Sequence, residues 1–168
     1  MENILNKFSN KSTFLIIMVL SIIMFKNCSK DPVQTDLLDY INKDLKELAD
    51  LESAAVDAYG GVTGDNYTSD QDLYQTLETT VIPKYKEFNA RLESVSVATS
   101  EVKEVHEKYI SGSNKQYQAF LKLQVAIEKQ DKNLVLEANS LLDAARKDLR
   151  DWKFELTELC SKHSVTLK

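Results

Sequence analysis

Apolar residues recur between residues 33 and 163 at alternating steps of three and four, the spacing that places side chains on one face of an α-helix. The first two faces comprise Leu38, Ile41, Leu45, Leu48, Ala55 and Tyr59, then Tyr74, Leu77, Val81, Tyr85, Phe88, Leu92 and Val95. The last two comprise Val102, Val105, Tyr109, Phe120, Leu123 and Ile127, then Ala138, Leu142, Ala145, Leu149, Trp152, Leu156, Leu159 and His163. Each face predicts an amphipathic helix, and the last is the most regular.

The breaks between these faces carry the residues expected at helix ends. Gly60, Gly61 and Gly64 follow the first face, and the polar stretch 96–100 follows the second. Asp131 precedes the fourth face as a candidate N-cap. Long helices joined by short polar connections predict an all-α fold, a four-helix up-down-up-down bundle. A three-helix bundle with a rearranged first half is the alternative.

Three features interrupt the patterns. Pro83 lies inside the second apolar stretch and predicts a kink or a split, because proline lacks a backbone donor and crowds the preceding turn. Residues 111–114 (SGSN) are poor helix formers and predict a weak point in the third helix. Glu52 is the single polar residue on the first apolar face.

The N-terminus has the composition of an export signal. Residues 12–25 form the uncharged apolar run STFLIIMVLSIIMF, preceded by Lys7 and Lys11. Its 14 residues match the apolar core of a signal peptide and fall short of the roughly 20 that span a bilayer. Cys28 follows shortly after this run. The arrangement resembles the precursors of bacterial lipoproteins, and this resemblance implies cleavage before Cys28 and lipidation of its thiol.

The lipoprotein pattern is matched incompletely. The family places an aliphatic residue three positions before the cysteine and a small residue directly before it, whereas this chain has Phe25 and Asn27. An uncleaved signal anchor with Lys26 as its stop, or simple secretion, are the alternatives. All three interpretations predict an extracytoplasmic location, at the cell surface or in the periplasm.

We therefore divide the chain into a signal peptide or anchor (1–27), a short tether (28–32) and the bundle (33–168). Removing 1–27 takes away three of 21 basic and one of 26 acidic residues, so the formal net charge changes from −5 to −7. An acidic surface argues against nucleic acid and against polybasic adhesion to lipid as partners. Membrane attachment is then expected through the N-terminus alone.

Metal and haem sites of helical bundles are not indicated, and no cofactor is expected. His106 and His163 are the only histidines, and neither completes the Glu-x-x-His motif of di-iron bundles. Cys160 and His163 stand three apart, close enough to share a metal, but tetrahedral zinc needs two more ligands. We therefore expect Cys160 to pack as a small apolar residue and His163 to end the helix. His106, between charged neighbours, is expected to be exposed.

The remaining polar features predict ordinary structural roles. The acidic loop of Asp65, Asn66, Asp70 and Asp72 lacks the pattern of a calcium-binding loop and is expected to cap the second helix. Six tyrosines at helical spacing are expected at the edge of the core with their hydroxyls in water. These are Tyr40, Tyr59, Tyr74, Tyr85, Tyr109 and Tyr117.

Without a catalytic motif, the sequence does not indicate an enzyme. Our leading hypothesis is a non-enzymatic interaction module that binds another protein of the cell envelope. The alternative is a small-ligand binding protein or sensor that opens a pocket near Pro83 and residues 111–114. A sensor predicts a cavity with convergent polar groups, whereas a module predicts a filled core and exposed apolar side chains.

Overall fold

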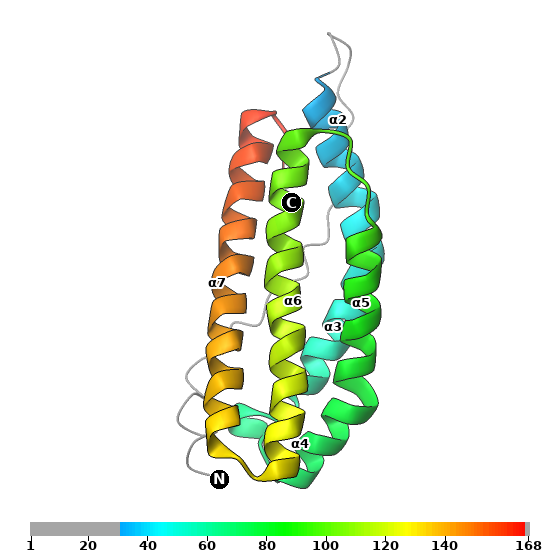
Figure 1. Cartoon of the computed structure of the whole chain (residues 1–168). Coiled ribbons are helices and arrows are strands. Elements are labelled where there is room, and N and C mark those ends of the chain that lie inside the picture. The colour runs from blue at the N-terminus through cyan, green and yellow to red at the C-terminus, as the bar shows by residue number, and fades with distance from the viewer. Residues whose placement is uncertain (1–30, 167–168) are drawn as a thin grey trace.

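The computed structural model describes residues 31–166, which form a bundle of long helices (Figure 1). Its elements in chain order are α2 (Pro32–Asp39), η2 (Tyr40–Leu45), α3 (Lys46–Gly60), η3 (Gly64–Asn66), α4 (Asp70–Thr76), η4 (Leu77–Val81), α5 (Ile82–Ser94), α6 (Ser100–Lys129) and α7 (Lys132–Lys162). Within the described residues there is no β-strand. The prediction of an all-α fold is confirmed.

Four helical rods result from these elements. The π-helical turns η2 and η4 continue the helices on either side of them, so α2 to α3 form the first rod and α4 to α5 the second. The helices α6 and α7 are the third and fourth, and they pack side by side along their whole length (Figure 1). This is the predicted up-down-up-down bundle, and the three-helix alternative is wrong.

The helix starts follow the capping residues in the sequence. Asp131 accepts hydrogen bonds from Asn133 N at 2.8 Å and Leu134 N at 3.4 Å, which confirms it as the N-cap of α7. Ser69 caps α4 by accepting from Asp72 N at 3.1 Å, and its own hydroxyl donates to the Asp72 carboxylate. The acidic loop therefore caps the second rod, as its sequence indicated.

The two π-helical turns explain where the sequence pattern fails. Leu38 was expected inside but is 38% exposed, and Leu37 is fully buried instead. A π turn adds one residue to the turn of an α-helix, so η2 rotates α2 relative to α3 and shifts its inner face by one position. At Pro83 the chain passes through η4 directly into α5 without a loop, so a split of the second rod is excluded.

The predicted weak point in α6 is continuous helix, and Gly112 there has a packing role. A Cβ atom at Gly112 would lie 2.9 Å from Cγ of Leu149 on α7, closer than real side chains approach. Ser113 beside it is buried. The absence of a side chain at Gly112 therefore lets α6 and α7 approach closely.

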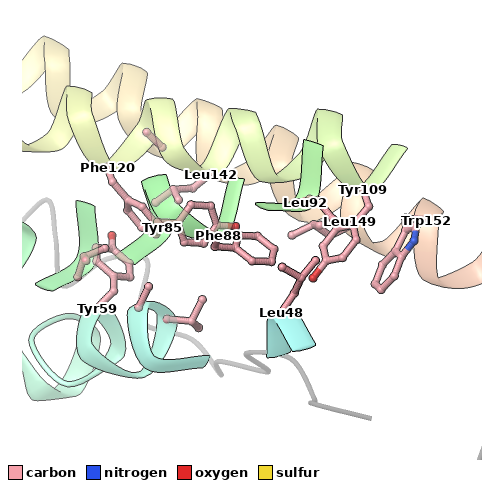
Figure 2. Packing of buried hydrophobic residues seen from close by; sticks show 14 of the residues in the cluster. Leu48, Tyr59, Tyr85, Phe88, Leu92, Tyr109, Phe120, Leu142, Leu149 and Trp152 are labelled. Atoms are coloured by element: carbon pink, nitrogen blue, oxygen red, sulfur yellow. The ribbon is translucent and has the colours of Figure 1, made fainter. Parts of the chain in front are cut away.

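Aromatic rings fill the centre of the bundle between these rods (Figure 2). Tyr85 packs edge-on against Phe88 and Phe120, with ring centroids 5.2 Å apart in both pairs. Burying each such side chain stabilises the fold by about 1.5–3 kcal/mol. Within residues 31–166, no helix is both long enough and apolar enough to cross a bilayer.

Candidate functional site

The sequence-predicted site residues lie at one end of the bundle or outside the described part of the chain. Cys28, the predicted lipidation site, lies outside the described residues. Cys160 is only 1% exposed on the inner face of α7, and burial raises the pKa of its thiol to about 11. The thiol is therefore protonated at neutral pH, which fits the expected role as a small packing residue.

His163 follows α7 as its C-cap residue and binds the start of the described chain. Its ring Nδ1 lies 2.6 Å from Oδ2 of Asp31, and this contact holds the pKa of the Asp31 carboxyl below its usual range. The Gln34 amide donates to the His163 carbonyl oxygen at 2.9 Å. Within residues 31–166, no group of three or more His, Cys, Asp or Glu side chains is arranged to hold a metal ion.

A second aspartate fastens α2 to the loop that precedes α6. The Asp36 carboxylate accepts from Ala98 N at 2.9 Å, from Thr99 N at 2.7 Å and from the Thr99 hydroxyl at 2.6 Å. Its negative charge lies at the N-terminus of α6, where the helix dipole favours an anion. We call the end of the bundle that contains Asp31, Asp36, Thr99 and His163 the tether end. There α2, the first described helix, is hydrogen-bonded to the residues that precede α6 and to the residue that follows α7.

The interior contains an acidic side chain, Glu52, which is the single polar residue on the apolar face predicted for the first rod. The Tyr109 hydroxyl on α6 donates to Oε2 of Glu52 on α3 at 2.5 Å. Glu52 as a whole residue is partly exposed, but its carboxyl group is covered by protein, and burial raises its pKa to about 7. Burial together with the neighbouring Glu52 carboxylate also raises the pKa of Tyr109 well above its usual value.

Further polar side chains surround this pair. The Trp152 ring stacks on Tyr109 with centroids 4.1 Å apart, and Figure 2 shows both rings beside Leu48 of α3. Tyr85 on α5 is completely buried, and its hydroxyl has no hydrogen-bond partner among the described residues. A hydroxyl left in that state costs about 1–3 kcal/mol. We call Glu52, Tyr85, Tyr109 and Trp152 the inner polar cluster.

Two predictions about this region are wrong. His106 is not exposed: it is 97% covered, and Nδ1 of its ring lies 3.2 Å from the Tyr40 hydroxyl, because the charged neighbours point outward while His106 faces inward. The hydroxyls of Tyr40, Tyr85 and Tyr109 do not point into water but are enclosed in the core. His106 is four residues after Val102 and three before Tyr109, so helical spacing already placed it on the apolar face.

The arrangement can bind and release a proton at Glu52, and it holds α2 firmly at the tether end. Neither cluster combines a nucleophile with a positioned base in the way that hydrolytic enzymes do. No protein-family model, curated protein or solved structure matches the chain. Function must therefore be inferred from these residues alone.

Proposed function

We propose that the chain is a membrane-tethered, extracytoplasmic lipoprotein whose helical bundle acts as a non-enzymatic interaction module for another envelope protein. The observation that carries the proposal is the position of the tether end. The first described helix starts at Pro32, four residues after Cys28. Three residues reach at most about 10 Å, so a lipid on Cys28 would hold Asp31 within that distance of the membrane.

The hydrogen bonds at the tether end support this role. Asp31 joins α2 to His163 at the end of α7, and Asp36 joins it to Thr99 at the start of α6. A pull on the tether is therefore shared by three helices. Helices of about 30 residues extend roughly 45 Å, so the α6–α7 turn lies at the opposite end of the bundle, whereas Phe154, eight residues before Lys162, lies about 12 Å from the tether end.

The surface and the packed middle of the bundle favour a module over a ligand sensor. The segment around Gly112, where a pocket was considered, packs directly on Leu149. Phe154 on α7 is 66% exposed, and Leu121 and Leu136 are exposed as well. Large aromatic side chains often anchor protein–protein contacts, so Phe154 is the first candidate for contact with the partner. The inner polar cluster is the observation in favour of the sensor alternative.

The tethering half of the proposal is tested by metabolic labelling with a fatty-acid analogue. Cells producing the wild-type chain should yield a labelled protein of the processed length, and cells producing Cys28→Ala should yield an unlabelled precursor. An unlabelled wild-type chain of precursor length would contradict the lipoprotein assignment. That result would leave the helical bundle unaffected.

The interaction half is tested by a photo-reactive phenylalanine analogue placed at Phe154 in living cells. Irradiation should give one discrete adduct. The same analogue at Lys86, an exposed position on α5, serves as the control. No adduct, or the same adducts from both positions, would contradict the proposed role of α7.

A further inference from the structure

The Glu52 carboxyl group has an unusual set of neighbours for an acidic side chain. From α6 it receives the Tyr109 hydroxyl at 2.5 Å, and the Tyr85 hydroxyl of α5 is close enough for the two groups to interact electrostatically. The member of the cluster on α7 is the uncharged Trp152 ring, which is stacked on Tyr109. None of the ion pairs formed by residues 31–166 includes Glu52.

Burial favours the neutral carboxylic acid over the carboxylate, and it outweighs the hydrogen bond from Tyr109, which favours the carboxylate. Both Tyr109 and Tyr85 are neutral, and a buried carboxylate without a cation is costly because it has lost its hydration. The first rod contributes Tyr40 and Asp44, of which Asp44 is negative when ionised and adds no compensating charge. A protonated Glu52 has one more hydrogen-bond donor, and the unpartnered Tyr85 hydroxyl is an acceptor on the adjacent helix.

We propose that Glu52, with Tyr109 and Tyr85, is a proton-binding site through which the surrounding pH controls how tightly α3 packs against α5 and α6. This inference goes beyond the proposed module function and does not depend on the lipid tether. Release of the proton leaves a carboxylate that must recover hydration. Because the carboxyl group is covered by protein, it can recover that hydration only if α3 loosens from the helices around it.

The sign of the effect follows from the direction of the shift. The pKa of Glu52 is raised to about 7 in the folded chain from 4.5. The stabilising effect is therefore complete below about pH 4.5 and is lost as the pH rises to about 7. The equilibrium constant for unfolding should increase roughly 100-fold between about pH 5 and pH 8.

His106 also titrates, but its effect has the opposite sign. Burial, the largest cause, lowers its pKa below the ordinary value of 6.5. Its contribution to stability is present above pH 6.5 and is lost as the pH falls through the lowered value. A bundle that becomes less stable as the pH rises from about 4.5 to about 7 therefore reports Glu52, and one that becomes less stable on acidification below pH 6.5 reports His106.

Trp152 makes the proposal directly testable, because it is the only tryptophan and stacks on Tyr109. The experiment is a pH titration of Trp152 fluorescence, and of urea unfolding, on the full-length chain in mild detergent. The wild-type fluorescence should show a transition near pH 7, and the wild-type stability in urea should fall from about pH 4.5 and level off above about pH 7. Glu52→Gln keeps the shape and a neutral acceptor for Tyr109, and it should abolish the transition, whereas His106→Gln should retain it.

A second measurement, made on the wild-type chain, tests the proposal even if Glu52→Gln fails to fold. The carboxyl carbons of glutamate in the wild-type chain, labelled with ¹³C, should include one that titrates near pH 7 and is missing in Glu52→Asp. The proposal is overturned if no glutamate titrates above about pH 5.5. It is also overturned if Glu52→Gln keeps the wild-type transition, or if His106→Gln abolishes it.

Discussion

Gly112 of α6 and Leu149 of α7 are in direct contact, with no room between them for even one additional carbon atom. Leu149 covers the gap left by the glycine, and Asp148 beside it approaches to 3.3 Å of the same position. On the outer edge of this contact, Lys115 and Asp148 form an ion pair across the two helices. A close approach of α6 and α7 is thus made in a segment that is poor in helix formers.

Gly112→Ala tests this relationship. Alanine favours a helix by about 1 kcal/mol over glycine, but overpacking costs about 1–3 kcal/mol, so we expect lower stability on balance. Gly60→Ala is the matched control, since a Cβ atom there meets nothing within 4 Å and should be neutral or stabilising. Urea unfolding followed by circular dichroism measures both. A more stable Gly112→Ala variant would show that Leu149 moves aside freely.

Leu149→Asp should be strongly destabilising. Leu149 is 5% exposed in the middle of α7, and an aspartate there would be a buried carboxylate without a partner, at a cost of several kcal/mol. This is comparable to the whole stability of a domain, about 5–15 kcal/mol. Leu136→Asp on the outer face of the same helix is the control and should leave the thermal melt almost unchanged. Equal effects of the two changes would contradict the assignment of the inner face of α7.

Asp36→Ala should loosen the tether end specifically. Three hydrogen bonds from Ala98 and Thr99 are lost, two of them from backbone N–H groups at the start of α6, and we expect a loss of about 1–3 kcal/mol. The exposed Asp39 provides the control as Asp39→Ala. Hydrogen exchange should quicken at residues 98–103 in Asp36→Ala alone. Protection that does not change there would mean that the loop is held by other contacts.

The helices and their ends could be predicted from sequence because they depend on local features. The period of the apolar residues defines α6 and α7, and Asp131 caps its helix through bonds within one turn. The local sequence does not indicate the extra residue of η2, because that residue depends on how the first rod packs against the others. For that reason the sequence pattern assigned Leu38 to the inner face and did not identify Leu37, which is fully buried.

The inner polar cluster was visible only in part. Glu52 stood out as the one polar residue on an apolar face, but its partner Tyr109 is 57 positions away and comes from another helix. The bonds of Asp36 to Thr99 and of Asp31 to His163 join residues 63 and 132 positions apart. Contacts of this kind follow from the packing of the rods, which a helical period alone does not determine.

The reactivity of Cys160 provides the next prediction. The attacking species in thiol chemistry is the thiolate. Cys160 is buried, and burial raises the pKa of its thiol to about 11. A maleimide at neutral pH should therefore modify Cys160 far more slowly in the folded chain than after denaturation in urea. Intact-mass spectrometry counts the added groups. Rapid modification of the folded chain would show that α7 opens at its C-terminal end.

The same reagent separates the two membrane assignments of the N-terminus. Cys28 and Cys160 are the only cysteines, so the number of reactive thiols reports the state of Cys28. In the lipoprotein, a thioether blocks Cys28, and the membrane-extracted protein should accept no maleimide when folded and one when denatured. An uncleaved anchor keeps its thiol, so one group should add rapidly to the folded chain and a second after denaturation. Cys160→Ala identifies the slow site, because it should remove only the group that denaturation exposes. A rapidly reacting thiol in a protein of precursor mass would contradict lipidation and favour the anchor.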